Sequence, residues 1–502
     1  MKIILGPPGT GKTTKLLSLV EGYLESGVPP DRIGYFAYSK RAAHEAITRA
    51  SVRFKLEEKQ LPYFRTLHSL GFKEMGISNK NLMKRSHYEE ISDWLKVPLN
   101  AGWEIEDTPF IDFGYGDKFL EVIQMSRIQC IPLREMYNKS DASLTTAWSM
   151  VDFVDRGIKE FKRKYNLYDY TDMLETFVSQ DLAPRLEVAF IDEGQDLSPI
   201  QWKMVHGISM AADETYIAGD DDQAIYRWAG ADVDKFIRLD GDIEVLSQSY
   251  RMPVSHHNLS QKLVQRIGTR RPKEFMPREE RGVVQWHTRS DTVDLGEGSW
   301  LLLARTRRLA EHLEGEVRER GHLFTSKLKG SDSTDIIRAI STWEHLRSGG
   351  KANVDNIRTV YQFMELRVQV AFGHKTMSKA DETKEYSIQE LTKDHGLLTQ
   401  EPWITALSRI PKEQATYLQS CMAKGEELDE KPRIHVSTIH GSKGAEADNV
   451  LLLTDYNQPP QNKVRFNPFY KDDECRVFYV GLTRAKENLH LIHPMFSKGF
   501  LI

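Results

Sequence analysis

The chain is poor in cysteine and has no long apolar run. Its three cysteines, Cys130, Cys421 and Cys475, are far apart and odd in number, so neither a disulfide framework nor a cysteine-based metal site is expected. The longest apolar runs, such as residues 450–453, have the length of a strand and fall far short of the roughly 20 residues that span a bilayer. The apolar residues 3–5 are too few for the core of a signal peptide. These absences predict a soluble, cytoplasmic protein in a reducing compartment.

The sequence also lacks a strong excess of charge of one sign. Its 502 residues include 68 Lys and Arg against 72 Asp and Glu, for a net charge of −4. This balance excludes a polybasic nucleic-acid coat protein and an acidic tail protein, but it leaves room for a local basic groove. With 40% apolar residues the composition is globular, and the length allows about three to four domains.

Short apolar runs, each followed by helical periodicity, fall into two groups. The first group is residues 2–5, 33–37, 187–191 and 215–218, and the second is 283–287, 300–304, 433–438, 450–454 and 488–492. Runs of this kind that alternate with helices are typical of buried parallel strands in α/β sheets, so two sheets are predicted. The stretches at about 71–165 and 348–431 carry helical patterns instead, including a helix within 141–164, and are predicted to be mainly helical insertions.

A glycine-rich segment directly follows the first expected strand. It fits the pattern G-x-x-x-x-G-K-[ST] and consists of Gly6, Pro7, Pro8, Gly9, Thr10, Gly11, Lys12 and Thr13, with Thr14 next in the helix that follows. Glycines let backbone N–H groups close around phosphate oxygens, and the helix N-terminus adds a favourable dipole. Lys12 would reach the β- and γ-phosphates of a nucleotide, and the Thr13 hydroxyl would bind Mg²⁺. The strand–loop–helix context disfavours the alternative, a glycine-rich turn that matches by chance.

An acidic pair closes another expected strand. Asp192 and Glu193 follow the apolar run 188–191. At the carboxyl end of a parallel strand beside a phosphate loop, one acid can hold Mg²⁺ and the second can orient or deprotonate water. Alone, such a pair is most often a solvated strand end. The upstream phosphate loop and the continuation through Gly194, Gln195 and Asp196 favour the catalytic interpretation.

Six further short segments complete a series along the chain. They are YSKRAA at 38–43, TLHS at 66–69, GDDDQAIYRW at 219–228, SYR at 249–251, STIHGSKGAE at 437–446 and YVGLTRAK at 479–486. With the phosphate loop and DEGQD at 192–196, these eight blocks resemble the UvrD/Rep-like superfamily 1 DNA helicases, and they stand in that family's order. The two stretches predicted as insertions match no part of the family pattern.

The resemblance implies an α/β fold with two RecA-like P-loop NTPase domains, each a parallel sheet flanked by helices and each carrying a mainly helical insertion. ATP would bind in the cleft between the two domains. On this template the parts are motor domain 1A at 1–70 and 166–242, insertion 1B at 71–165, motor domain 2A at 243–347 and 432–502, and a short insertion 2B at 348–431.

The resemblance also assigns roles at an ATP and Mg²⁺ site. Thr13 and Asp192 would hold Mg²⁺, and the other site residues would be Glu193 to activate water, Gln223 to sense the γ-phosphate, Arg251 and Arg484 as arginine fingers from the second domain, Tyr250 to stack on adenine, and Glu446 near the ribose and triphosphate. Such an arginine contributes about 10³- to 10⁵-fold in rate. Taken alone, either arginine would be interpreted as a surface salt bridge and Tyr250 as a half-buried strand-end residue. Because the first strand begins at residue 2, the family's adenine-reading glutamine segment is not expected, which leaves Tyr250 as the main purine contact.

A single-stranded DNA track is implied by the same blocks. Candidate DNA contacts are Tyr38, Thr66, His68, Tyr226, Trp228 and His440. Trp228 resembles the family's base-stacking tryptophan, and its alternative is a core residue; for His68 and His440 a structural role is equally open. Basic residues gather at 32–55 and at 251–273, the latter without any acid, which favours a phosphate-binding groove or, alternatively, a solvated helix face.

The resulting hypothesis is an ATP-dependent motor that moves 3′ to 5′ on single-stranded DNA and separates duplex. Its expected partners are single-stranded DNA, single-strand/duplex junctions and replication or repair proteins, with no membrane, and the expected state is a monomer or weak oligomer. Two alternatives stay open: an ATP-switched DNA-binding accessory factor that strips or recruits proteins without strong unwinding, and a nucleotide or small-molecule kinase.

Overall fold

The computed structural model describes residues 1–100, 103–104, 111–112, 117–326, 328, 334–378, 380–428, 430–456, 469–496 and 498–502. The chain divides into two compact units. The first comprises Met1–Gly282, Gln458–Thr483 and Ile502, and the second comprises Val283–Asn457 and Arg484–Leu501. Each unit is built on its own sheet.

The sheet of the first unit has six parallel strands in the order β3-β2-β6-β7-β1-β8. Its strands are β1 (Lys2–Leu5), β2 (Ile33–Ala37), β3 (Phe64–Thr66), β6 (Leu186–Ile191), β7 (Ala212–Gly219) and β8 (Asp242–Val245). The central strands are buried on both faces, as expected for a parallel sheet covered by helices. Because all strands run the same way, the loops that follow β1, β2, β6 and β7 leave from one edge of the sheet.

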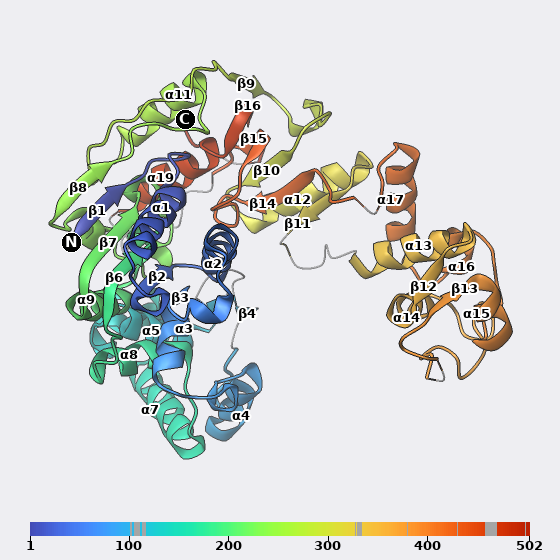
Figure 1. The fold of residues 1–502 in the computed structure, drawn as a ribbon, viewed down its shortest axis with the longest axis horizontal. Helices are drawn as coiled ribbons and strands as arrows, with labels where there is room; N and C mark the ends of the chain where they lie inside the picture. The colour runs from blue at the N-terminus through green and yellow to red at the C-terminus, as the bar shows by residue number, and fades with distance from the viewer. Residues whose placement is uncertain are drawn as a thin grey trace. The chain divides into compact units, whose positions relative to one another are not determined.

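Helices of the first unit flank this sheet (Figure 1). The helices that contact its strands include α1 (Lys12–Glu25), α2 (Lys40–Phe54) and α9 (Pro199–Ala211). The first unit also contains α10 (Val233–Ile237), α11 (Val254–Val264) and α19 (Tyr470–Leu482). Helix α2 begins where the Ser39 side chain accepts a hydrogen bond from the Ala42 N–H, a favourable helix cap. Helices α1 and α2 contact each other, and α1 also contacts β7 while α2 contacts β2. Apolar side chains from these helices and strands, such as Leu16, Tyr35 and Phe190, form one core.

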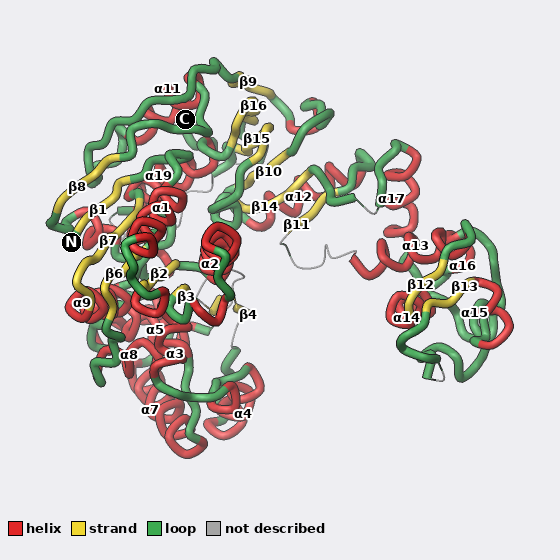
Figure 2. Tube along the Cα trace, viewed as in Figure 1, coloured by secondary structure: helices red, strands yellow, loops and turns green. Residues whose placement is uncertain are grey.

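The described residues between 67 and 179 of the first unit are mainly helical (Figure 2). The helices are α3 (Leu67–Glu74), α4 (Arg85–Leu95), α5 (Lys118–Ile128), α6 (Leu133–Lys139), α7 (Trp148–Tyr165) and α8 (Tyr170–Ser179), with one antiparallel pair, β4 (Trp103–Glu104) and β5 (Ile111–Asp112). Helix α7 lies where a helix was expected within 141–164. Several of these helices share a separate apolar core that includes Ile91, Val151 and Val154.

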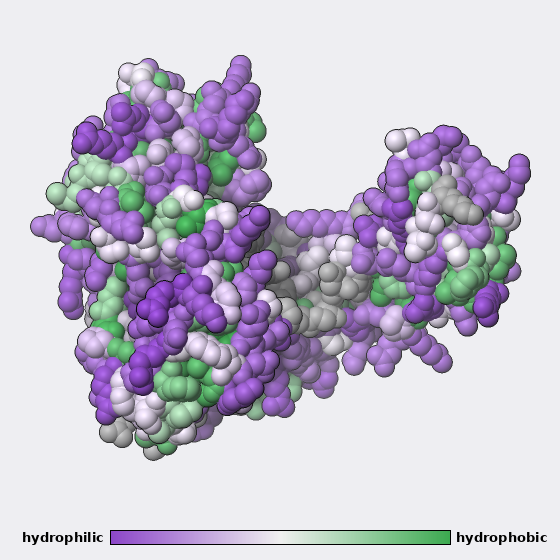
Figure 3. Space-filling view, turned by 90° about the horizontal axis from the view of Figure 1, so that it is seen from below, coloured by the Kyte–Doolittle hydropathy of each residue, from purple (hydrophilic) through white to green (hydrophobic). Residues whose placement is uncertain are grey.

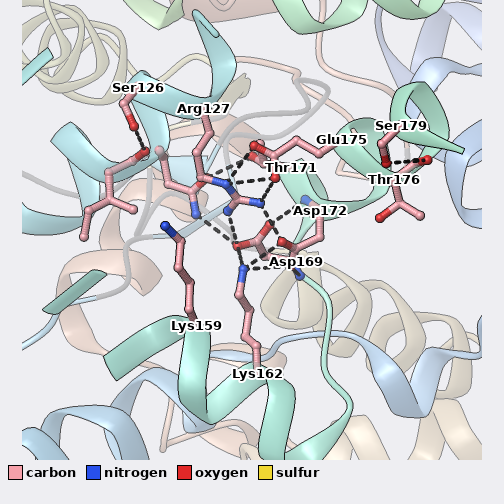
Figure 4. A network of polar contacts seen from close by, with 12 residues as sticks. Ser126, Arg127, Lys159, Lys162, Asp169, Thr171, Asp172, Glu175, Thr176 and Ser179 are labelled. Atoms are coloured by element: carbon pink, nitrogen blue, oxygen red, sulfur yellow. Dashed lines mark hydrogen bonds and ion pairs between the residues drawn. The ribbon is translucent and has the colours of Figure 1, made fainter. Parts of the chain in front are cut away.

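Ion pairs, most of them buried, join three of these helices (Figure 4). Arg127 of α5 contacts Asp169, Asp172 and Glu175 at 2.6–2.7 Å, and Lys162 of α7 contacts Asp169 at 2.9 Å and Asp172 at 2.8 Å. Asp169 also caps α8 by accepting from the Asp172 N–H. We refer to these five side chains as the helix cluster; they fix α5, α7 and the start of α8 to one another.

The second unit has a six-stranded parallel sheet in the order β11-β14-β10-β15-β16-β9. Its strands are β9 (Val283–His287), β10 (Trp300–Ala304), β11 (Phe324–Ser326), β14 (Ile434–Thr438), β15 (Ala447–Leu453) and β16 (Ala485–Ile492), with helix α12 (Arg307–Glu319) packed on β10 and β14. Buried residues of this sheet and α12, such as Leu302, Leu313 and Val436, form a core.

A further part of the second unit has its own core around Trp343. It contains α13 (Thr334–Arg347), α14 (Val354–Gln362), α15 (Ile388–Asp394), α16 (Trp403–Ala406), α17 (Lys412–Ala423) and the antiparallel pair β12 (Lys351–Asn353) and β13 (Glu385–Ser387). On the face shown in Figure 3 hydrophilic residues cover most of the surface and apolar residues gather in small patches. Among the described helices, none combines the length and apolar character needed to cross a membrane.

Two parallel α/β sheets flanked by helices confirm the predicted fold class. The predicted boundary near residue 243 falls inside β8, which pairs with β1 in the first sheet. The first compact unit continues to Gly282 and regains α19 from near the C-terminus. The four-part division into two motor domains and two insertions therefore stays a prediction.

Candidate nucleotide and nucleic-acid site

The loop after β1 is shaped by glycine. Gly9 and Gly11 have φ angles of 72° and 79°, in the left-handed region that glycine adopts without strain. Gly11 is the N-cap of α1, and its carbonyl accepts from the Lys15 N–H at 2.8 Å. Within the loop the Thr10 hydroxyl donates to the Pro7 carbonyl at 2.8 Å. A tight glycine-rich turn thus leads directly into a helix N-terminus, an arrangement that binds phosphate.

Lys12 lies across this loop. Its Nζ donates to the Gly6 carbonyl at 2.9 Å and is 3.6 Å from Glu193 Oε1. A Cβ atom at Gly6 would lie 1.9 Å from the Lys12 Cγ, so the absence of a side chain at residue 6 makes room for the lysine. The loop therefore positions one ammonium group beside the predicted general base.

The acids after β6 meet the start of α1. Asp192 Oδ2 accepts from the Tyr35 hydroxyl at 2.8 Å and from Thr13 Oγ1 at 3.4 Å. Burial, together with the charge of Glu193, raises the pKa of Asp192 to about 6. Glu193 itself has a φ of 56°, an uncommon conformation for a residue other than glycine. The structure thus brings together the predicted residues Lys12, Thr13, Asp192 and Glu193.

Thr13 and Asp192 offer a hydroxyl and a carboxylate oxygen to a cation. Mg²⁺ usually takes only one or two protein ligands and completes its shell with phosphate and water. The donor pair therefore fits Mg²⁺ bound together with a nucleotide. Over the residues that the structure describes, no group of three or more His, Cys, Asp or Glu side chains is arranged to hold a metal alone.

The turn after β7 is linked to the same acids by hydrogen bonds. Gln223 Nε2 donates to Asp220 Oδ2 at 2.7 Å, and the Asp220 N–H donates to Gln195 Oε1 at 3.0 Å. Gln195 Nε2 in turn donates to Glu193 Oε2 at 2.6 Å. A Cβ atom at Gly219 would lie 2.4 Å from Gln195 Oε1, so glycine is required for this approach. Gln223 and Glu193 are consequently held in one connected arrangement.

The segment after β8 lies against the phosphate loop within the first unit. The Tyr250 N–H donates to the Gly9 carbonyl at 2.8 Å, and the Ser249 hydroxyl donates to the Pro8 carbonyl at 2.7 Å. A Cβ atom at Gly9 would lie 2.3 Å from the Arg251 Cβ, and Arg251 Nη1 is 3.5 Å from the Thr483 carbonyl. The Tyr250 side chain is 74% exposed, which leaves its ring accessible to a ligand and shows that it is not a half-buried residue.

Three predicted site residues belong to the second unit. Arg484 is buried, and its Nη1 donates to the Ala445 carbonyl at 3.4 Å. Glu446 forms an ion pair with Lys486 at 2.9 Å. His440 lies in the turn after β14 and is half-buried. Their roles toward ATP and DNA stay predictions.

The DNA candidates of the first unit differ in exposure. Tyr38 and Tyr226 are buried and stack on each other with ring centroids 5.4 Å apart; burial, with the charge of Asp196, raises the pKa of Tyr38 well above its usual value. Thr66 is buried and caps α3 by accepting from the Ser69 N–H. Trp228, by contrast, is 55% exposed, so it is not a core tryptophan.

His68 packs against an aromatic side chain. Its ring meets that of Tyr170 edge to face at 6.1 Å. Burial and the nearby charge of Lys40 lower the pKa of His68 to about 4, so the ring is neutral at pH 7. A neutral imidazole attracts DNA phosphates weakly, and a contact from His68 would have to be a hydrogen bond.

The basic run at 251–273 is not one open groove. Lys273 is buried among three aspartates, Arg270 pairs with one of them, and Arg271 donates to the Ile237 and Leu239 carbonyls. For these three residues both interpretations of the sequence, a phosphate groove and a solvated helix face, are wrong. Their partners come from segments far away in the chain, which a local charge count does not include.

Sequence reasoning missed four residues that support the site. Tyr35 and Arg476 were not singled out, Lys273 was interpreted only as part of the basic run at 251–273, and Gln195 only as part of a block. Arg476 is fully buried; its Nε donates to the Asp221 carbonyl at 2.9 Å and its Nη2 to the Thr269 carbonyl at 2.6 Å. A charged residue in the apolar run of α19 was the available signal, because a buried arginine needs partners.

Comparison with known protein families assigns the chain to a family. The family described as the UvrD/REP helicase N-terminal domain matches residues 2–244, and that described as the UvrD-like helicase C-terminal domain matches residues 231–494. The chain therefore belongs to the UvrD/Rep-like helicase family.

Individual relatives are distant. A probable DNA helicase of Mycoplasma pneumoniae is 23% identical over 50% of this chain and 49% of its own length. The ATP-dependent DNA helicase PcrA of Bacillus subtilis is 21% identical over 61% of this chain and 54% of its own. A probable DNA helicase II homolog of Mycoplasma pneumoniae is 21% identical over 100% of this chain and 83% of its own. The chain thus spans about half the length of the first two relatives and most of the third.

Proposed function

We propose that this protein is an ATP-dependent DNA helicase or translocase that moves 3′ to 5′ along single-stranded DNA and couples ATP hydrolysis to duplex separation. The observation that carries the proposal is the convergence of Lys12, Thr13, Asp192 and Glu193 at one edge of the first sheet, with Arg251 against the phosphate loop. Membership of the UvrD/Rep-like family supports the same activity, and relatives are named as ATP-dependent DNA helicases.

The hydrolytic role of each side chain follows from its chemistry. Lys12 would neutralise phosphate charge, and Thr13 and Asp192 would hold Mg²⁺, which supplies further charge neutralisation when it is bound. Glu193 would accept the proton of the attacking water, and Gln223 would contact the γ-phosphate. Hydrolysis of this kind depends on positioning and charge neutralisation rather than covalent chemistry.

Two arginines would complete the proposed hydrolytic site. Arg251 follows Tyr250 directly, and that segment is hydrogen-bonded to the Gly9 carbonyl, so movement of the loop and of the arginine would be linked. Arg484 is proposed as a second cation, with Glu446 near the ribose and triphosphate. Guanidinium groups that reach the γ-phosphate only after closure would make hydrolysis depend on domain movement.

The DNA track is proposed to pass over Trp228. An exposed aromatic face stacks on a base with about 1–3 kcal/mol per base, and Trp228 is the exposed aromatic among the predicted contacts of the first unit. Tyr38, Thr66, His68, Tyr226 and His440 are proposed to line or shape this track. Single-strand/duplex junctions and replication or repair proteins would be the partners.

ATPase measurements with and without single-stranded DNA test the enzymatic proposal. Lys12→Ala is expected to abolish turnover, and Glu193→Gln is expected to keep nucleotide binding while hydrolysis falls by about 10²-fold or more. Lys15→Ala is the matched control, because Lys15 lies on the same helix and pairs with the exposed Glu244. Turnover that single-stranded DNA does not stimulate would favour a kinase or another nucleotide enzyme.

Unwinding and polarity need a separate assay on tailed duplexes. Strand separation with a 3′ tail, and none with a 5′ tail, is the expected result. DNA-stimulated hydrolysis without strand separation on either substrate would favour the accessory-factor alternative. Separation from 5′ tails alone would contradict the proposed polarity.

The proposed track is tested at Trp228. Trp228→Ala is expected to weaken single-strand affinity by about 1–3 kcal/mol and to leave the melting temperature nearly unchanged, because the side chain is exposed. Trp286→Ala, at a tryptophan of β9 that is 43% exposed, serves as the control and should leave affinity unchanged. Equal affinities of the two variants would contradict the assignment.

A further inference from the structure

Three consecutive aspartates in the turn after β7 surround one lysine. Asp220, Asp221 and Asp222 have exposed fractions of 0%, 0% and 1%. Lys273 Nζ lies 3.0 Å from Asp220 Oδ1, 2.6 Å from Asp221 Oδ1 and 2.9 Å from Asp222 Oδ2, and its side chain is 1% exposed. A single buried ammonium group thus contacts a carboxylate from each residue of the run.

The residues that precede Lys273 in the sequence also bind this turn. Arg270 makes a two-point contact with Asp222 at 2.8 and 2.6 Å, and the Arg271 N–H donates to Asp221 Oδ2 at 2.8 Å. We call Lys273, Arg270 and the three aspartates the turn cluster. Arg476 of α19 links the Asp221 carbonyl to the Thr269 carbonyl, so three distant stretches of the chain meet here.

The turn cluster continues into the hydrolytic residues. The same Asp220 that contacts Lys273 through Oδ1 accepts from Gln223 Nε2 through Oδ2 at 2.7 Å. The Asp220 N–H donates to Gln195, whose Nε2 contacts Glu193 at 2.6 Å. Asp220 alone therefore separates Lys273 from Gln223, and Asp220 and Gln195 separate Lys273 from Glu193. Lys273 makes no direct contact with Gln223 or Glu193.

The position of the turn depends on the charge of Lys273 for an electrostatic reason. Buried carboxylates are tolerated only when they are paired and hydrogen-bonded, and removal of one partner leaves an uncompensated charge. Without the ammonium group, the three aspartates would repel one another and draw in water, which would shift the turn. Misplacement of a catalytic group by about 1 Å can lower the rate by about 10²-fold.

We propose that Lys273 is a positioning residue for hydrolysis, which holds the three-aspartate turn so that Gln223 and Glu193 keep their working geometry. This inference rests on the proposed ATPase function. It adds a residue that lies outside all eight sequence blocks and that acts through Asp220 rather than on the nucleotide.

The test compares two buried lysines of the same chain. Lys273→Met is expected to lower kcat for ATP by about 10- to 100-fold while KM for ATP changes less than about threefold, because the phosphate loop is not altered. Lys162→Met is the matched control, since Lys162 is also buried between two aspartates and belongs to the helix cluster. It is expected to lower the melting temperature without a comparable loss of kcat.

Each outcome decides the question. A kcat of Lys273→Met equal to wild type, or a loss no larger than that of Lys162→Met, would overturn the inference. If Lys273→Met does not fold, Asp220→Asn replaces it; this variant keeps the size of the side chain but removes the charge between Lys273 and Gln223. A loss of kcat of about tenfold or more is expected, and unchanged kcat would overturn the inference.

Lys12→Ala is measured in parallel to separate the two proposals. Loss of turnover in Lys12→Ala with normal turnover in Lys273→Met overturns only the positioning role. Absence of ATP hydrolysis in the wild-type protein, or full activity in Lys12→Ala, overturns the proposed function itself.

Discussion

The helix cluster and the turn cluster are built from the same kinds of charge but are connected to different neighbours. In the helix cluster, Arg127 and Lys162 pair with carboxylates that begin α8, so the charges fix one helix against two others. In the turn cluster, Lys273 and Arg270 pair with aspartates whose next hydrogen bonds lead to Gln223 and Glu193. Both clusters are buried and paired, and they differ in the contacts that their carboxylates make next.

The largest expected effect is on the stability of the helix cluster. Asp169→Ala removes a carboxylate that is 3% exposed and that pairs with both Arg127 and Lys162. Removal of one member of a buried ion pair costs about 3–5 kcal/mol. Urea unfolding measures this loss. Asp152→Ala, which breaks the exposed pair with Arg156 on α7, is the control and should cost at most about 1 kcal/mol.

The same variant sharpens the comparison through its activity. At a temperature where Asp169→Ala is folded, its kcat for ATP should match that of the wild-type protein, because the helix cluster has no contact with the hydrolytic residues among those described. A fall in kcat as large as that expected for Lys273→Met would show that the two clusters do not differ in function.

Coupling within and between clusters is the next effect. Lys273→Met and Asp222→Asn remove partners that lie 2.9 Å apart, and a double-mutant cycle should give an interaction energy of about 0.5–3 kcal/mol. Lys273→Met combined with Lys162→Met should be additive within about 0.5 kcal/mol, since the two lysines contact different carboxylates. Strong coupling between the lysines would contradict the independence of the clusters.

The pH dependence of stability gives a smaller, directional effect. The charges of Arg127 and Lys162 hold the pKa of Asp169 well below its usual range despite burial, whereas burial and the charge of Asp169 raise the pKa of Asp172. The folded-state pKa of Asp169 is below the unfolded-state value of about 3.9. Ionised Asp169 therefore adds to the free energy of unfolding above that value, and this contribution is lost as pH falls toward the folded-state pKa. The slope is at most about 1.4 kcal/mol per pH unit for one proton.

Asp169→Asn tests this sign. The difference in unfolding free energy between wild type and Asp169→Asn should be constant from pH 7 to about 5 and should narrow below about pH 4. The facing groups Arg127, Lys162, Asp172 and Glu175 are present in both proteins, although loss of the Asp169 charge removes one cause of the raised pKa of Asp172. A difference that widens as pH falls would contradict the depressed pKa.

The smallest expected effect is the loss of an exposed ion pair. Glu311→Gln breaks the pair between Arg307 and Glu311 on α12, whose side chains are 50% and 49% exposed. Exposed helix pairs contribute about 0.3–0.5 kcal/mol, so the unfolding free energy should change by about that amount and less still in high salt. A loss comparable with that of Asp169→Ala would mean that burial is not what separates these pairs.

The fold was predictable where strands are buried on both faces. Residues 2–5, 33–37 and 300–304 form buried strands with the expected bounds. Residues 283–287 also form a strand with the expected bounds, although this strand is largely exposed and lies at a sheet edge. Within the two six-stranded sheets the sequence pattern missed β3, β8 and β11, and each lies at the edge of its sheet. The pattern also missed the short strands of the antiparallel pairs β4–β5 and β12–β13. Edge strands are short and partly exposed, so their apolar periodicity is weak, and only pairing with a neighbour defines them.

The candidate site shows the same division. The phosphate loop and the acids after β6 could be predicted because each function needs a short, local pattern of residue types. Tyr250 was predicted in a separate motor domain, and the structure shows its N–H on the Gly9 carbonyl within the first unit. Thr66 was predicted to contact DNA, and its side chain is buried as a helix cap. The Tyr250 contact joins segments that lie far apart in the sequence, whereas the Thr66 cap is a local bond to the Ser69 N–H, and the DNA contact of Thr66 stays a prediction.

By itself the sequence determined the local elements of this protein: a strand, a glycine-rich turn and a helix in an arrangement of the kind that binds phosphate, and an acidic pair at the end of a strand. Only the tertiary structure decided which charges are buried. Lys273 is basic in any fold, but it becomes a buried partner because residues 220–222 and 476 meet its segment. The physical reason is that the energy of a charge depends on what surrounds it in space, and those neighbours lie about 50 and 200 residues away along the chain.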